Sequence, residues 1–153
     1  EVTLAIILAA ITRSIIITVI SIIVFSLIVK IHIYSIFYIF IFAFLGSFIL
    51  GAVGFIAGLW AEKFDHMATV TNFIITPLSF LSGVFYSVDR LPSFFQSISK
   101  VNPFFYMIDG FRFGFLGISD GSINFGLIYL TILSVAVWFI SYYLFKMGYK
   151  IKS

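Results

Sequence analysis

Residues 87–121 read SVDRLPSFFQSISKVNPFFYMIDGFRFGFLGISDG, and this stretch decides how the whole chain is interpreted. It holds two of the three prolines and eight aromatic side chains. Its charged side chains are Asp89, Arg90, Lys100, Asp109, Arg112 and Asp120. The stretch is too polar to span a bilayer and too aromatic for an exposed linker. We therefore predict that it lies partly inside the membrane boundary without crossing it.

The overall composition is that of an integral membrane protein. Hydrophobic residues make up 62% of the 153 residues, charged residues only 10%, and the mean hydropathy is +1.20. Soluble domains carry about 25% charged residues, so no soluble core can hide this much apolar surface. Cysteine is absent, which excludes disulfides and cysteine metal sites from this sequence. The net charge of +3 is too small to indicate nucleic-acid binding.

Four apolar runs are long enough to cross a bilayer, which takes about 20 residues of helix. We predict an all-α membrane fold in a single domain, residues 1–153, with transmembrane spans near 12–30, 35–60, 67–87 and 122–145. The connections at 30–34 and 61–66 are short, so the spans that they join are expected to be antiparallel neighbours. Because the chain begins with Glu1 and enters an apolar run at once, we expect a piece of a longer membrane protein.

Arg13 lies inside the first apolar run. A charged side chain at the bilayer centre costs about 2.5–3.5 kcal/mol on insertion scales, whereas an interfacial arginine extends its stem toward the headgroups. We therefore place Arg13 at the cytoplasmic interface and predict that residues 2–12 form an interfacial helix ahead of the span. The alternative is a buried functional charge.

The lysines and arginines near the span ends indicate which side of the membrane each connection faces. With four spans, Arg13, the 61–66 connection and the C-terminal tail fall on the same side. The tail lysines are Lys146, Lys150 and Lys152, and the basic residues on the opposite side are Lys30, Arg90, Lys100 and Arg112. The concentrated tail lysines favour a cytoplasmic C-terminus, which places residues 87–121 outside.

Small residues recur at helical spacing along the second span. They are Ala43, Ser47, Gly51, Gly54 and Gly58. Small side chains let helix backbones approach closely in lipid. This face fits packing within the chain and contact with a second subunit equally well.

Pro77 lies in the middle of the third span and removes a backbone hydrogen bond, so we expect a kink there. The polar residues of the same span are Asn72, Thr76, Ser79 and Ser82. Two interpretations stay open for them. They either bond to carbonyls that the kink frees or face a substrate path.

Residues 90–118 are predicted to form two short helices. Pro92 is suited to the first turn of one helix, and the pair Asn102-Pro103 ends it and turns the chain. The second helix is expected to run to about Leu116. Because each helix is too short to span a bilayer, we predict a re-entrant hairpin. The alternative is an amphipathic pair lying flat on the membrane surface.

The charged and titratable residues show no catalytic pattern. Asp109 and Arg112 are spaced to form an ion pair on one helix. His32 and His66 lie at different span ends, and neither metal-ligand spacing nor a phosphate-binding loop occurs. If the protein uses ATP, another polypeptide or domain binds it, so we expect this chain not to be an enzyme.

Several stretches together resemble one known family. They are GLWAEKFD at 58–65, NFIITPLSFLSGVFY at 72–86, and the pairs and runs Leu91-Pro92, Asn102-Pro103 and Asp109-Gly110-Phe111-Arg112. The sequence is similar to the permease subunit of type 2 ATP-binding-cassette exporters. It most resembles the bacterial inner-membrane branch with nodulation-factor and polysaccharide export permeases. The similarity covers nearly the whole chain, and the pattern of residues 77–86 is fairly specific.

The resemblance implies a six-span permease protomer of which this chain holds the last four spans. It implies a pair of permease copies and a separate ATPase subunit that binds ATP and Mg²⁺, with no cofactor on this chain. The cargo would be lipid-linked, glycan or drug-like. The alternatives are a membrane scaffold or assembly subunit, and a channel or secondary carrier.

The resemblance also suggests roles for individual residues. We expect the translocation path to be lined by Asn72, Thr76, Pro77, Ser79, Ser82, Phe85 and Tyr86. We expect the outer gate to comprise Pro92, Phe94, Phe95, Asn102, Pro103, Phe104, Phe105, Tyr106, Asp109 and Arg112. The residues facing the ATPase would be Glu62, Lys63 and Asp65.

Overall fold

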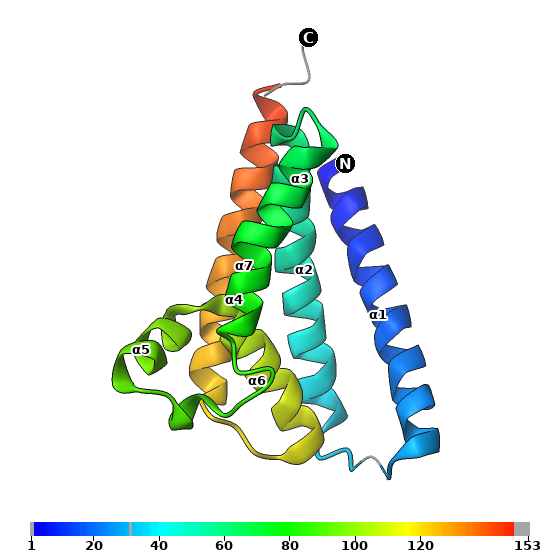
Figure 1. The fold of residues 1–153 in the computed structure, drawn as a ribbon. Coiled ribbons are helices and arrows are strands. Elements are labelled where there is room, and N and C mark those ends of the chain that lie inside the picture. The colour runs from blue at the N-terminus through cyan, green and yellow to red at the C-terminus, as the bar shows by residue number, and fades with distance from the viewer. Residues whose placement is uncertain (1, 31, 149–153) are drawn as a thin grey trace.

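The computed structural model describes residues 2–30 and 32–148, and this part of the chain consists of helices and their connections, without strands (Figure 1). The elements are α1 (Val2–Ile28), α2 (Ile36–Trp60), α3 (Phe64–Val70), a π-helical turn η1 (Thr71–Ile75), α4 (Thr76–Phe80), a 3₁₀ turn η2 (Val88–Arg90), α5 (Ser93–Val101), α6 (Pro103–Leu116) and α7 (Ile123–Lys146). Of the described helices, α1, α2 and α7 are long and apolar enough to cross a membrane.

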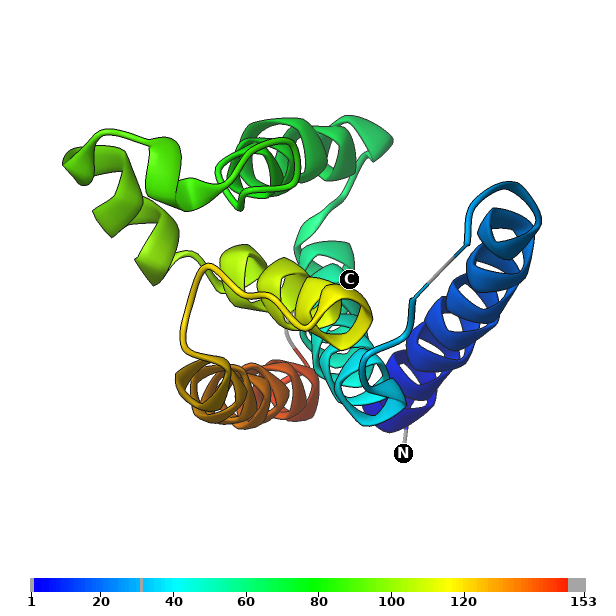
Figure 2. The same cartoon turned by 90° about the horizontal axis from the view of Figure 1, so that it is seen from below.

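Helix α2 is the centre of the bundle. Helices α1, α6 and α7 pack directly against it, and α6 also packs against α7 (Figure 2). The main core joins α2, α6 and α7 and contains Phe42, Leu45, Ile49, Val88, Phe105, Tyr106, Met107 and Leu130. A second cluster joins the first half of α1 to α2 and α7 through Ile7, Ile11, Ala52 and Val137. Beyond this cluster α1 diverges from α2 toward Ile28 (Figure 1).

Local sequence explains where α6 and α7 begin and end. The side chain of Asn102 caps α6 by accepting a hydrogen bond from the N–H of Phe104 at 3.0 Å, and Pro103 fits the first turn because its missing N–H would have no partner there. Gly117 ends α6 in the left-handed conformation, with φ of +69°. Ser122 caps α7 in the same way as Asn102 caps α6.

The two ends of the bundle carry different connections. The N-terminal end of α1, the connection between α2 and α3, and the end of α7 lie together at one end (Figure 1). The connection between α1 and α2 and the pair α5–α6 lie toward the other end. This grouping of the connections is the predicted one, but Arg13, which was predicted to lie at the first end, is near the middle of α1. Lys150 and Lys152, on which the predicted orientation also rests, lie outside the described residues.

The first helix differs from the prediction. Instead of an interfacial helix over residues 2–12 and a span from residue 12, one helix runs from Val2 to Ile28 without a break at Arg13. The reason is local, because the segment contains neither proline nor glycine to interrupt the backbone hydrogen bonds. At 1.5 Å per residue this helix is about 40 Å long, which exceeds the roughly 30 Å of a bilayer's hydrocarbon core.

The third predicted span also has different bounds. Its helical part begins at Phe64 and ends at Phe80, so the preceding connection consists of residues 61–63 only. A tight turn follows in which Gly83 has φ of +78°, a backbone conformation that favours glycine. The expected helix over residues 81–87 therefore does not form. We call residues 64–80 the Pro77 segment.

Candidate functional site

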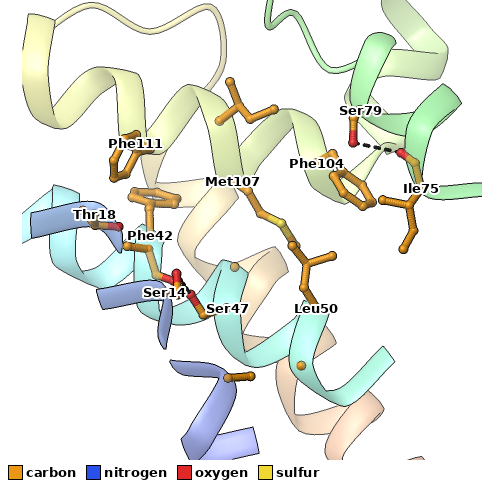
Figure 3. Close-up of a pocket in the computed structure, with 15 residues that line it drawn as sticks. Ser14, Thr18, Phe42, Ser47, Leu50, Ile75, Ser79, Phe104, Met107 and Phe111 are labelled. Atoms are coloured by element: carbon orange, nitrogen blue, oxygen red, sulfur yellow. Dashed lines mark hydrogen bonds between the residues drawn. The ribbon is translucent and has the colours of Figure 1, made fainter. Parts of the chain in front are cut away.

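A cavity of about 660 Å³ lies between α1, α2, α6 and the Pro77 segment (Figure 3). Its walls are formed by Ala10, Ser14, Thr18, Phe42, Ala43, Gly46, Ser47, Leu50, Gly51, Ile75, Ser79, Phe104, Met107, Ile108 and Phe111. All of its lining side chains are uncharged, and the polar ones are hydroxyls. The hydroxyls of Ser14 and Ser47 are 2.6 Å apart and join α1 to α2. Such a wall suits an uncharged or apolar group better than an ion.

Only part of the predicted path faces this cavity. Ser79 lines it, while Phe85 is 75% exposed on the outside of the described chain. Asn72 and Pro77 are also exposed, Thr76 and Tyr86 are half-buried, and Ser82 is buried. The structure therefore brings Ser79 together with Phe104 of the predicted gate across one cavity, and it leaves the other predicted path residues outside its lining.

The hydroxyls of the Pro77 segment bond to its own backbone. Thr76 Oγ1 donates to the carbonyl of Thr71 at 2.9 Å, and Ser79 Oγ donates to the carbonyl of Ile75 at 2.8 Å. Ser82 Oγ donates to the carbonyl of Ser79. The wide π-helical turn lies immediately before Pro77, as expected where a proline disturbs the helical ladder. None of these acceptors is the carbonyl of Asn72 or Phe73, which the missing N–H of Pro77 leaves without its helical partner. The bonds therefore do not decide between the two interpretations, and Ser79 also faces the cavity.

The junction between α5 and α6 lies near the middle of α2. Helix α6 runs antiparallel to α2, because Gly114 packs beside Ile39, Gly110 beside Phe42, and Met107 beside Gly46. The C-terminal end of α6 is bonded to the start of α2, because the N–H of Ser35 donates to the carbonyl of Gly114 at 2.8 Å. The start of α6 therefore lies next to the middle of a helix of 25 residues.

The polar groups at this junction are satisfied by the Pro77 segment and by Leu81, the residue that follows it. Asn102 is buried, and its Nδ2 donates to the carbonyl of Leu78 at 2.6 Å. Ser99 Oγ donates to the carbonyl of Leu81 at 2.9 Å. Irregular backbone at membrane depth is tolerated where protein covers it, and these two bonds supply such cover.

The aromatic residues assigned to the gate fall into different environments. Phe94 and Phe95, which follow Pro92 in α5, are exposed on the described surface. Phe105 and Tyr106 are buried in the main core, where they pack rather than line an opening. The Tyr106 hydroxyl donates to the carbonyl of Lys100 at 2.9 Å. Phe104 is the only described gate aromatic that lines the cavity.

An ion cluster joins α6 to the loop that follows it. Arg112 Nη2 lies 2.7 Å from Asp109 Oδ1, which confirms the predicted pair, and 2.9 Å from Asp120 Oδ2. Asp109 is only 2% exposed and also accepts hydrogen bonds from the N–H groups of Asp120 (2.8 Å) and Gly121 (3.0 Å). The sequence spacing predicted the first pair only.

Asp120 connects this cluster to a third part of the chain. Its Oδ2 accepts hydrogen bonds from Ser87 Oγ at 3.0 Å and from the N–H of Val88 at 3.1 Å. Burial raises the pKa of the Asp120 carboxyl, but the hydrogen bonds from Arg112, Ser87 and Val88 lower it by more. The pKa of Asp120 therefore lies below its ordinary value, and the carboxylate is ionised at neutral pH.

The small residues of α2 divide between two environments. Gly51 and Ser47 face α1, where a Cβ added at Gly51 would lie 3.0 Å from Ala10 Cβ. Gly54 and Gly58 are exposed, and a Cβ at either would have no described atom within 4 Å. The closest helix contacts instead involve Gly110 and Gly114 of α6, which sequence reasoning missed although they have the same four-residue spacing.

The end of the bundle that carries the termini also carries exposed charges. Glu62 and Lys63 lie in the connection between α2 and α3, while Asp65 lies in the first turn of α3. The N–H of Glu62 donates to Nδ1 of His66 at 3.3 Å. No group of three or more metal-binding side chains occurs within residues 2–30 and 32–148.

Comparisons with known proteins identify the family. The family model described as "ABC-2 type transporter" matches residues 1–116. The chain belongs to the ABC-2 type transporter family. Together with the three long apolar helices, membership shows a multi-pass membrane protein. No solved structure matches the chain of this ABC-2 protein.

Two kinds of curated relative match this ABC-2 chain. "Inner membrane transport permease YadH" of Escherichia coli is 40% identical over 111 residues, which cover 71% of the chain and 43% of the relative. "Nodulation protein J" of Rhizobium leguminosarum bv. viciae is 35% identical over 66 residues, which cover 43% of the chain and 26% of the relative. "Nodulation protein J" of Sinorhizobium fredii is 28% identical over 97 residues, or 63% and 37%. The match thus spans less than half of each relative.

Proposed function

We propose that this chain is part of the permease subunit of an ATP-binding-cassette exporter in the bacterial inner membrane. The observation that carries the proposal is the match of the ABC-2 type transporter family to residues 1–116, supported by the similarity to a protein named an inner membrane transport permease. The permease supplies the pathway, and a separate ATPase subunit binds ATP and Mg²⁺ and supplies the driving force.

In this proposal four segments cross the bilayer. Helices α1, α2 and α7 cross as full-length spans, and the Pro77 segment, about 25 Å long at 1.5 Å per residue, completes the fourth with the turn that follows. Residues 90–118 form the re-entrant hairpin. Its support is the position of Asn102 beside the middle of α2 and the bonds that this residue and Ser99 make to the Pro77 segment.

The proposed orientation places the C-terminus in the cytoplasm. Glu62, Lys63 and Asp65 then face the ATPase, and the hairpin faces outward. Two permease copies pair, and ATP binding tilts the cytoplasmic ends so that the outer gate opens. Gly54 and Gly58 lie on an open part of α2, where a second copy or further segments of the full-length protein would pack.

Cargo is proposed to pass along the Pro77 segment. The path comprises the predicted residues from Asn72 to Tyr86, with Ser79 and Phe104 meeting at the uncharged cavity. The absence of charge from this lining favours a lipid-linked or other amphiphilic cargo, whose apolar part would occupy it, over an ion.

The proposal is tested with the full-length protein and an ATP-binding-cassette ATPase from the same organism. We expect the two proteins to co-purify and the reconstituted complex to hydrolyse ATP faster in the presence of cargo. A chain that assembles with other membrane proteins but never with an ATPase would instead be a scaffold subunit. Substitutions of Pro77 and Phe85 that leave transport unchanged would show that the path assignment is wrong.

A further inference from the structure

The Pro77 segment is fastened to the bundle at its ends. Among the described helices, α3 contacts α2 at the beginning of the segment, and α4 contacts α6 at its end. The cavity occupies the space on its inner side, between Ser79 and α1 (Figure 3). A wide π-helical turn and Pro77 lie between the two fastened ends, and such irregularities are frequent hinge points in helices.

The outer fastening consists mainly of hydrogen bonds. Asn102 and Ser99 hold the carbonyls of Leu78 and Leu81. Farther along, Asp120 holds both Ser87 and the N–H of Val88. The side chain of Val88 is 1% exposed and belongs to the main core. Asp120 therefore fixes the backbone at the point where the chain leaving the Pro77 segment re-enters the packed bundle.

The interactions of the ion cluster differ in whether a movement of the Pro77 segment can break them. Asp109 and Arg112 lie one turn apart on α6, so their ion pair survives any rigid movement of that helix. The carboxylate of Asp109 also holds the N–H groups of Asp120 and Gly121, which keeps this loop with α6. The bonds from Asp120 to Ser87 and Val88 are the ones that cross to the end of the Pro77 segment.

We propose that Asp120, held in place by Arg112, is a latch that keeps the outer end of the Pro77 segment closed against the hairpin. Release of Ser87 and Val88, followed by exchange of the bonds from Asn102 and Ser99, lets this end swing about the π-helical turn and Pro77 and opens the cavity outward. Asp120 is a positioning residue in this scheme, since it touches the moving segment rather than the cargo. The inference rests on the proposed exporter function and adds the element that moves.

Cysteine cross-linking tests the latch directly. The sequence has no cysteine, and the side chains of Ser87 and Asp120 are in hydrogen-bond contact at 3.0 Å, so the pair Ser87→Cys and Asp120→Cys is chosen to form a disulfide in place of the latch. The experiment uses the full-length protein assembled with its ATPase, in which any cysteines outside this sequence are replaced. We expect the disulfide to form at least about fivefold more slowly when the ATPase is trapped with ATP, a typical factor for coupled sites. The cross-linked protein should lose transport and regain it on reduction.

Controls separate the latch from general damage and from the exporter proposal. Oxidation should not change the transport rate of either single-cysteine variant. Asp120→Asn should raise the rate of ATP hydrolysis in the absence of cargo, and Asp120→Glu should return this rate to that of the unmodified protein. These two variants test the latch if the double-cysteine variant fails to fold. Equal cross-linking rates in both nucleotide states of a working exporter would overturn the latch alone. Failure of the unmodified protein to assemble with an ATPase would overturn both proposals.

Discussion

Two helical segments lie against the same bundle by different means. Helix α6 is packed onto α2 so closely that its glycines touch the side chains of Phe42 and Ile39. The Pro77 segment is held through carbonyls that accept hydrogen bonds from Asn102 and Ser99, and through Asp120 beyond its end. Close apolar packing resists gradual deformation, whereas hydrogen bonds can be exchanged singly. The comparison indicates a fixed hairpin helix and a movable span.

The largest effect is expected where α6 meets α2. A Cβ at Gly110 would lie 2.3 Å from the Phe42 ring, and one at Gly114 would lie 2.8 Å from the backbone nitrogen of Ile39. Because Phe42 is fully buried, we expect Gly110→Ala or Gly114→Ala to lower the free energy of unfolding by about 3 kcal/mol, the upper end for overpacking. Thermal unfolding in detergent measures it.

The matched control is Gly58→Ala, at an exposed helical glycine with nothing within 4 Å. This change should leave the stability of the isolated chain unchanged or raise it by about 1 kcal/mol through helix propensity. Equal losses at Gly110 and Gly58 would contradict the view that α6 is fixed by close packing.

A smaller effect is expected at the junction that holds the Pro77 segment. Asn102→Ala removes both the cap of α6 and the bond to Leu78, and should cost about 2 kcal/mol, typical of losing a cap together with a buried hydrogen bond. Asn102→Ser keeps a capping oxygen but is too short to reach Leu78. If the segment is held by this anchor, Asn102→Ser should recover only the stability that the cap supplies and should still alter transport. Full recovery of both stability and transport would argue against the anchor.

Within the Pro77 segment we expect a change in transport with little change in stability. Ser79→Ala and Thr76→Ala each remove one hydroxyl that bonds to the local backbone, a loss of about 1 kcal/mol or less. Ser79 lines the cavity and Thr76 does not. A bulky replacement, Ser79→Leu, should therefore slow cargo efflux from vesicles more than Thr76→Leu, which changes a proposed path residue outside the cavity lining. Equal slowing by both would remove the cavity from the path.

The smallest effect is expected from pH. The pKa of Asp120 is lowered in the folded protein, so its ion pair contributes fully above the unfolded pKa of about 3.9 and is lost as pH falls through the folded value. The difference in melting temperature between the unmodified chain and Asp120→Asn should stay constant from about pH 8 to pH 5. A difference that disappears within this range would show that Asp120 is not ionised through its pairing with Arg112.

Much of the local structure followed from the sequence. Pro92, Asn102 and Pro103 predicted where α5 and α6 begin, and the Asp109–Arg112 pair followed from helical spacing, because capping and spacing depend only on neighbours along the chain. The third helix was predicted to continue through residues 81–87, where the backbone turns at Gly83. A run of apolar residues does not reveal such a turn, since hydropathy records only the environment.

By itself, the sequence determined that this protein is an α-helical membrane protein, where most of its helices lie, and which family it resembles, since apolar length, proline and capping residues act locally. Only the tertiary structure decided which glycines are packed. The pairs Gly54–Gly58 and Gly110–Gly114 have the same four-residue spacing, and only the second pair faces a neighbouring helix in the described part of the chain. It also decided that Ser79 and Phe104 share a cavity and that Asp120 holds Ser87. These contacts join residues distant along the chain, and their geometry depends on how the helices pack.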